Sequence, residues 1–179
     1  MAVKDKKRRL FFALWPTARV REAIVDMSSP FLHEMAGRII RPQNLHITLH
    51  FIGSVSSDKK DCLHKAAQSV IASSFNLCLD GLGHFSKAKI FWMAAQNFPP
   101  GLSSLHQNLG EALAACDFHG DQRVYSPHVS LMRKFKERSI NYPEFSISWQ
   151  VDEFVLVESC SGAGGVNYKV IERYPLQGQ

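Results

Sequence analysis

The chain has 179 residues, a length that a single domain can fill without disulfides or metals to hold it together. Hydrophobic residues make up 45% and charged residues 21% of the sequence, a balance that argues against intrinsic disorder. No apolar run approaches the roughly 20 residues of a membrane span, and residues 10–15 are too few for the apolar region of a secretory signal. We therefore expect a soluble protein with a cytoplasmic location and no contact with membranes.

Most of the formal net charge of +5 lies at the amino terminus. Five basic residues and Asp5 give +4 within the first nine positions, so the rest of the chain carries only +1. We interpret residues 1–8 as a basic tail and residues 9–176 as one domain. The tail is either a solvated end or a segment weakly attracted to a polyanion such as RNA, and charge alone does not decide between them.

The four cysteines contain no CxxC pair, and their spacing is typical of neither a zinc site nor a dense disulfide framework. Cys62 and Cys116 fall at apolar positions of helical patterns. We therefore expect buried free thiols, which fit a reducing compartment.

The amino-terminal half alternates strands with helices. Residues 9–15 are a short apolar run before Pro16 and predict a strand. Apolar side chains at helical spacing predict a helix over 18–35, which Pro30 kinks or interrupts. Residues 45–52 alternate strictly and predict a strand that Gly53 ends. One face of this strand carries Leu45, Ile47, Leu49 and Phe51, and the other carries His46, Thr48 and His50.

The remaining elements continue this mixed order. We expect helices over 56–74 and 102–116 and strands over 75–85, 89–96 and 128–132. Two further strands, 146–159 and 166–174, flank a glycine-rich hairpin turn at 162–165. Helices interleaved with alternating strands predict an α+β fold whose sheet has one solvated face.

A short pattern occurs twice, at a separation close to half the chain. His46-Ile47-Thr48-Leu49 and His128-Val129-Ser130-Leu131 both read histidine, β-branched residue, hydroxyl residue, leucine, and 128 − 46 = 82. Each copy lies on a short strand that follows a helix and a loop. The repeat predicts a duplicated unit whose two copies face each other across a pseudo-twofold cleft.

The strand period gives this pattern a chemistry. Residues i and i+2 share a face, so His46 projects with Thr48, and His128 projects with Ser130. Near neutral pH one imidazole can be neutral while the other is protonated. That arrangement supplies a base for an attacking oxygen and an acid for a leaving oxygen, as phosphodiester cleavage requires. The two hydroxyls can donate to phosphate oxygens, and no metal or cofactor is called for.

Several segments together resemble a known family. The segments are RLFFALWP, NLHITLHFIG, SPHVSLMRK and the terminal YKVIERYPL. They resemble the 2H phosphoesterase superfamily, and most closely its RNA 2′,3′-cyclic phosphodiesterases, also called 2′-5′ RNA ligases. The resemblance covers residues 9–176. It implies a bilobal pseudo-twofold α+β fold, with two antiparallel sheets flanking a central cleft and helices outside.

The resemblance also implies roles for individual residues. His46 matches the histidine that acts as proton donor, and His128 matches the proton acceptor. Thr48 and Ser130 match hydroxyls that contact the phosphate; Ser130 stands where threonine is frequent. Tyr125 stands where phenylalanine is common, and we expect it to stack on a base or ribose. The implied partners are RNA 2′,3′-cyclic phosphate ends or nucleotides, bound by a monomer.

Arg133 matches a basic residue expected at the phosphate, but a regular strand points it to the wrong face. It follows His128 by five residues, so the strand must end or bulge near Met132 for Arg133 to reach the cleft. The alternative is a solvated basic loop that includes Lys134, Lys136 and Arg138. His50 shares the expected face of His46 and Thr48, where it would support the site.

The motifs specify the chemistry better than the substrate. The main interpretation is hydrolysis of RNA 2′,3′-cyclic phosphates to 2′-phosphates, with reversible 2′-5′ ligation as related chemistry. The alternative from another class of function is a module that binds RNA ends without catalysing a reaction. A phosphodiesterase for a different cyclic or 2′-5′ linked nucleotide is a third.

Overall fold

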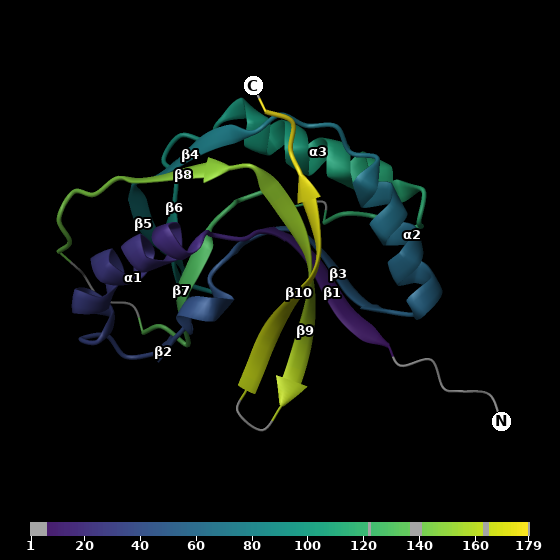
Figure 1. The fold of residues 1–179 in the computed structure, drawn as a ribbon. Coiled ribbons are helices and arrows are strands. Elements are labelled where there is room, and N and C mark those ends of the chain that lie inside the picture. Colours follow the sequence, from purple (N-terminus) through teal and green to yellow (C-terminus); the bar gives the residue numbers. More distant parts are fainter. Residues whose placement is uncertain (1–6, 122, 137–140, 163–164, 179) are drawn as a thin grey trace.

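The computed structural model describes residues 7–121, 123–136, 141–162 and 165–178 (Figure 1). Most of the expected basic tail therefore lies outside the described residues. In chain order, the elements are β1 (Arg8–Leu14), α1 (Ala18–Leu32), β2 (Arg38–Ile39), the 3₁₀ helix η1 (Pro42–Asn44), β3 (Ile47–Val55), α2 (Ser57–Gln68), β4 (Phe75–Leu79), β5 (Gly81–Phe85), β6 (Ile90–Ala94), α3 (Pro100–Ala114), β7 (Val129–Arg133), β8 (Ile147–Val151), β9 (Glu153–Gly162) and β10 (Gly165–Pro175).

These strands form two antiparallel sheets. The eight-stranded sheet has the order β10-β9-β1-β3-β7-β6-β5, and β2 pairs with β7 beside this path. The second sheet contains β4 and β8. In the large sheet, β3 and β7 share only the pair Ile47↔Val129, so two groups of strands diverge from this point. The expected α+β architecture with two antiparallel sheets is confirmed.

The two lobes repeat one β-α-β unit. The unit β1-α1-β3 corresponds to β6-α3-β7, and in each unit the two strands pair with each other. Helices α1 and α3 have 15 residues each, and Ala18 and Leu32 precede Pro100 and Ala114 by 82 positions. The pseudo-twofold axis therefore passes close to the Ile47–Val129 pair.

Apolar stripes of the helices build the main core. Leu102, Leu105, Leu109 and Leu113 of α3 are buried, as are Val20, Ile24 and Phe31 of α1. A smaller cluster covers the opposite face of β1 and β9 and consists of Phe11, Ala13, Val155 and Val157. Trp15 and Tyr168 pack against this second cluster. This cluster lies beside His46, because the Phe11 ring is 4.9 Å from its imidazole.

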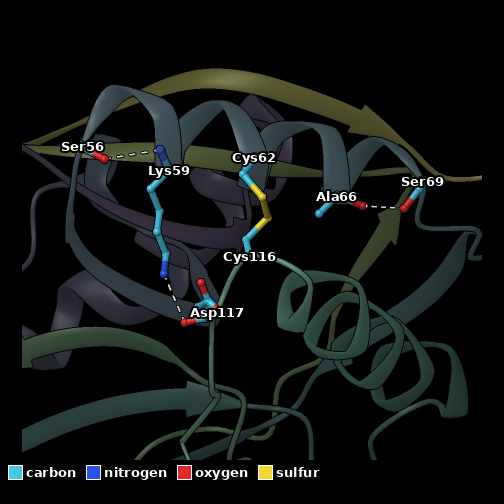
Figure 2. Close-up of a disulfide and its surroundings, with 7 residues drawn as sticks. All are labelled: Ser56, Lys59, Cys62, Ala66, Ser69, Cys116 and Asp117. Carbon is cyan, nitrogen blue, oxygen red and sulfur yellow. Dashed lines mark hydrogen bonds between the residues drawn. A yellow bond between two sulfur atoms is a disulfide. The ribbon is translucent and has the colours of Figure 1, made fainter.

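Several expected boundaries are wrong for identifiable reasons. Asp80 separates β4 from β5 and Asp152 separates β8 from β9, because at each aspartate the chain passes from one sheet to the other. Helix α2 ends at Gln68, six residues early, where the Ser69 hydroxyl donates to the Ala66 carbonyl at 2.8 Å (Figure 2). Pro30 lies inside α1, two residues before its end.

Two strand boundaries of the large sheet differ from expectation, and the glycine-rich hairpin agrees with it. Gly53 does not end β3; it adopts φ = 84° and the strand continues to Val55. Gly162 pairs with Gly165, as the expected hairpin requires, with positions 163–164 outside the described residues. Arg8 belongs to β1 and forms an ion pair with Glu158 at 3.6 Å, so the strand begins inside the expected tail.

The expectation of free thiols at Cys62 and Cys116 is wrong. The two residues form a disulfide between α2 and the turn that follows α3, with their Cα atoms 5.9 Å apart (Figure 2). Both were placed on apolar stripes, and it is the packing of those two stripes against each other that brings the sulfurs together. Beside the disulfide, the Lys59 ammonium donates to the Asp117 carbonyl at 3.1 Å. The argument for a reducing compartment therefore loses its basis in these cysteines.

Candidate active site

A β-bulge interrupts both motif strands at the same relative position. Opposite β1, Ala13 pairs with Thr48 and Phe12 with His50, which leaves Leu49 without a partner. Opposite β6, Trp92 pairs with Ser130 and Phe91 with Met132, which leaves Leu131 without one. The first five residues of β3 and the five of β7 share one burial sequence: buried, half-buried, buried, buried, exposed. The bulge is therefore part of the repeated unit.

The bulges change which side chains face the cleft. An extra residue reverses the alternation, so Phe51 and Arg133 join the face of Thr48 and Ser130. The bulge that Arg133 needs is present, at Leu131, and Arg133 lines the cleft. The strict alternation expected over 45–52 is wrong beyond Thr48. His50 points to the opposite face, where it is buried and bonds through Nε2 to the His106 carbonyl at 2.8 Å.

The cleft brings five of the six expected site residues together. It has a volume of about 430 Å³, and His46, Thr48, His128, Ser130 and Arg133 all line it. Strands β3 and β7 run antiparallel through Ile47–Val129, so His46 is directed towards Ser130 and His128 towards Thr48. The two histidines thus occupy equivalent positions on either side of the pseudo-twofold axis.

Both imidazoles are held in the same way. His46 Nδ1 lies 2.7 Å from the Asn44 carbonyl, and His128 Nδ1 lies 2.7 Å from the Ser126 carbonyl. A carbonyl only accepts, so each Nδ1 carries the proton and each Nε2 is left for chemistry. His46 Nε2 lies 3.2 Å from the Thr48 hydroxyl. When His46 is neutral, that hydroxyl donates to it.

Aromatic rings fix the orientation of His46 further. Trp15 stacks on the imidazole at 5.6 Å, and Tyr168 meets it edge-on at 5.2 Å. Phe11 lies 4.9 Å away. On the other side of the cleft, Phe85 meets His128 edge-on at 4.9 Å. Both rings are therefore positioned before any ligand arrives, which is what acid–base catalysis requires of them.

A sequence profile of the 2′-5′ RNA ligase superfamily matches residues 34–162. The chain belongs to this superfamily. An Escherichia coli (strain K12) relative named RNA 2′,3′-cyclic phosphodiesterase is 32% identical over 96% of this chain and 98% of its own length. A relative of the same name from Thermus thermophilus is 28% identical over 96% of this chain and 91% of its own length. The resemblance inferred from the sequence is confirmed.

Solved structures of superfamily members share the fold. The apo form of Escherichia coli LigT matches with a TM-score of 0.89 at 32% identity, over 96% of this chain and 99% of LigT. LigT complexed with 3′-AMP matches with a TM-score of 0.88 over the same shares. Complexes of LigT with ATP and with phosphate match as well. The 2H phosphoesterase fold expected from the motifs is thus the observed one.

The pKa values of both histidines in the cleft are lowered, and the causes differ in part. Burial lowers the pKa of His46 to about 4, and the positive charges of Arg133 and His128 act in the same direction. The Asn44 carbonyl opposes them, because it accepts from the ring. Burial also lowers the pKa of His128. In the free cleft both rings are therefore held as neutral imidazoles at neutral pH.

Tyr125 does not join the cleft. Its ring stacks on His106 at 3.8 Å, and its hydroxyl donates to the Thr48 carbonyl at 3.1 Å. His106 stacks in turn on His50 at 4.2 Å. The stack supports β3 from the side opposite the cleft. The structure therefore gives no support to the expected contact between Tyr125 and a base or ribose.

The cleft also contains residues that sequence reasoning missed. Besides the expected Arg133, three arginines line it, namely Arg9, Arg38 and Arg41, and the described lining residues include no aspartate or glutamate. Phe51 is 54% exposed, and the Arg9 guanidinium lies 5.0 Å above its ring. Strand alternation was a usable signal for Arg9, two residues before Phe11 on β1. Nothing in the sequence around Arg38 or Arg41 indicated their place.

Proposed function

We propose that this protein is an RNA 2′,3′-cyclic phosphodiesterase that opens the cyclic phosphate to a 2′-phosphate. The observation that carries the proposal is the pair of histidines in one cationic cleft. Each is anchored through Nδ1 to a carbonyl two residues upstream, and each stands beside a hydroxyl. The name RNA 2′,3′-cyclic phosphodiesterase, carried by the 32% identical relative, supports the same reaction.

The reaction uses the two Nε2 atoms in opposite states. His128 Nε2 takes a proton from water as the water oxygen attacks phosphorus. The bond between phosphorus and the 3′ oxygen breaks, and His46 Nε2 gives its proton to that oxygen. The product carries a 2′-phosphate and a 3′-hydroxyl. Because the histidines flank the pseudo-twofold axis, attacking and leaving oxygens lie on opposite sides of phosphorus.

Three donors stabilise the charge that develops on the phosphoryl oxygens. Thr48 and Ser130 each offer one hydroxyl from the face of their own histidine, and Arg133 offers a guanidinium fork. The Thr48 hydroxyl bonds to His46 in the free protein, so substrate has to redirect it. Donors placed in advance at the site of developing charge account for a large share of such rate enhancements.

The deciding experiment is turnover of adenosine 2′,3′-cyclic phosphate by the purified protein in excess chelator. Hydrolysis to the 2′-phosphate is expected, with His46→Ala and His128→Ala each nearly inactive. The double variant is expected to be little worse than either single one, because the two act as a unit. Binding without turnover would favour the end-binding module. A requirement for an added divalent ion would contradict the two-histidine mechanism.

Location, metal use and oligomeric state remain part of this proposal. The described residues include no helix long and apolar enough to cross a membrane. They also include no cluster of three or more histidine, cysteine, aspartate or glutamate side chains suited to a metal ion. We infer a cytoplasmic location from the expected RNA substrate, and we propose a monomer, which sedimentation or size-exclusion of the purified chain tests directly.

A further inference from the structure

Two arginines stand directly opposite each other at one end of the cleft. The two-residue strand β2 pairs with β7 in the register Arg38↔Arg133 and Ile39↔Met132. The Ile40 amide extends the pairing by donating to the Leu131 carbonyl at 2.8 Å. Opposite residues of an antiparallel pair share a face, with Cβ atoms about 5 Å apart, and like charges there destabilise each other. Within the described chain neither guanidinium takes part in an ion pair.

A third guanidinium is fixed beside this pair by the β9–β10 hairpin. Arg41 donates to the Asn167 side chain at 3.0 Å, and the Asn44 amide donates to the Val166 carbonyl at 2.9 Å. Gly165 adopts φ = 102°, and a Cβ there would lie 2.7 Å from an Arg38 guanidinium nitrogen. The glycine therefore allows the hairpin to approach Arg38 closely. The hairpin and the segment around η1 together hold Arg38 and Arg41 at the cleft wall.

The positive charge here exceeds what one reacting phosphate needs. That phosphate lies between the two Nε2 atoms, with Thr48, Ser130 and Arg133 as its donors. Arg38 and Arg41 line the same cleft, with Arg38 opposite Arg133 in the strand register. Strand register holds the like charges of Arg38 and Arg133 close together, and an anion that binds between them reduces their repulsion. Guanidinium forks match the oxygens of a phosphate.

We propose that Arg38 and Arg41, next to Arg133, form a second phosphate subsite for the phosphodiester on the 5′ side of the terminal nucleotide. The inference rests on the proposed function, and it specifies the substrate class as RNA strand ends. A free nucleoside 2′,3′-cyclic phosphate has no group for this subsite. An RNA end places its neighbouring phosphate one ribose away from the reacting one.

The test compares two substrates that differ by one phosphate: adenosine 2′,3′-cyclic phosphate with and without a 5′-phosphate. For the wild-type protein we expect kcat/KM about tenfold higher with the 5′-phosphate, as one charge-assisted contact of ~1.4 kcal/mol gives. Arg38→Gln is expected to reduce this ratio to about two or less. Arg38→Lys keeps the charge but loses the fork, so an intermediate ratio is expected. The matched control is Lys65→Gln, which removes an exposed cation of α2 and leaves the ratio unchanged.

A binding measurement separates failure of the subsite from failure of the proposed function. Calorimetry compares adenosine 3′,5′-bisphosphate with 3′-AMP, and the bisphosphate is expected to bind about tenfold more tightly to wild type but not to Arg38→Gln. Equal kcat/KM for the two substrates in an active wild type overturns the subsite. An unchanged ratio in a folded Arg38→Gln overturns the assignment to Arg38. No turnover of either substrate overturns the proposed function, and the binding ratio then decides the subsite alone.

Discussion

Anion binding in the cleft is expected to drive a proton onto His46. The pKa of this histidine is held at about 4, chiefly by burial and further by the charges of Arg133 and His128. A general acid has to be protonated in the complex, so the bound phosphate must raise the pKa. The free and bound proteins then differ in the number of protons they hold.

The size of the effect follows from Coulomb's law. A unit negative charge about 4 Å from the ring stabilises its protonated form by roughly 4 kcal/mol at an effective dielectric constant near 20. At about 1.4 kcal/mol per unit, the pKa rises by roughly 3, to about 7. At about pH 6 the ring is then about 1% protonated when free and about 90% when bound. Binding should therefore take up roughly 0.9 proton.

Calorimetry with dimethyl phosphate measures this uptake without turnover, because this diester keeps a single negative charge across the relevant pH range. The observed enthalpy is compared in two buffers of different ionisation enthalpy, and the slope gives the number of protons. His46→Gln is expected to lose the uptake, whereas His33→Gln, at an exposed position off the cleft, keeps it. Binding with no proton uptake, or with uptake unchanged in His46→Gln, would refute the reasoning.

Three further predictions concern the donors, the disulfide and the buried histidines. Thr48→Val keeps the shape and loses the donor, so kcat should fall about 10²–10³-fold with a smaller change in KM; a wild-type kcat would limit the hydroxyl to supporting β3. Replacing both Cys62 and Cys116 by alanine removes a disulfide between residues 54 positions apart in the sequence. The free energy of unfolding should fall by about 4 kcal/mol and Tm by roughly 10 °C, and an unchanged Tm would contradict this. The pKa values of His46, His50, His106 and His128 are lowered in the folded protein, so the unfolded chain binds more protons between about pH 4 and 6.5. The urea midpoint of unfolding should therefore decrease as the pH is lowered from about 6.5 to 4. A midpoint that does not change over this range would contradict the role of these histidines.

The proposed catalytic pair was readable from the sequence because its determinants are local. A strand period of two places His46 with Thr48 and His128 with Ser130, and the repeat at 82 residues indicates that the two strands are equivalent. Both inferences need only residue types and spacing. The structure agrees with them because each bulge follows the hydroxyl residue, so the alternation holds as far as Thr48 and Ser130.

The rest of the site depends on partners far apart in the chain. Leu49 and Leu131 fit a regular alternation as well as a bulge, so the reversal beyond them is visible only in the register with β1 and β6. Arg38 reaches the cleft because β2 pairs with a strand almost 100 positions later. The disulfide depends on how α2 and α3 pack, which the four cysteine positions did not reveal.

The bulges place different residues at equivalent positions, and we propose that this difference decides the roles of the two histidines. Phe51 and Arg133 follow the two bulges 82 positions apart, so the equivalent position is aromatic on one motif strand and cationic on the other. Burial is the main cause of the lowered pKa of both histidines, and the Arg133 charge lowers the pKa of His46 further. When a phosphate neutralises Arg133, this additional penalty is lifted from His46. We therefore propose that His46 takes the proton and acts as the acid, with His128 as the base.

A substrate with sulfur in place of the 3′ bridging oxygen tests this assignment, because a thiolate leaves without needing a proton. His46→Ala is expected to hydrolyse the sulfur substrate at a rate within about tenfold of wild type, since an acid contributes roughly 10²–10⁴-fold only where the leaving group must be protonated. His128→Ala is expected to stay impaired on both substrates, because water still has to be activated. Rescue of His128→Ala instead of His46→Ala would reverse the roles and show that Arg133 does not decide them.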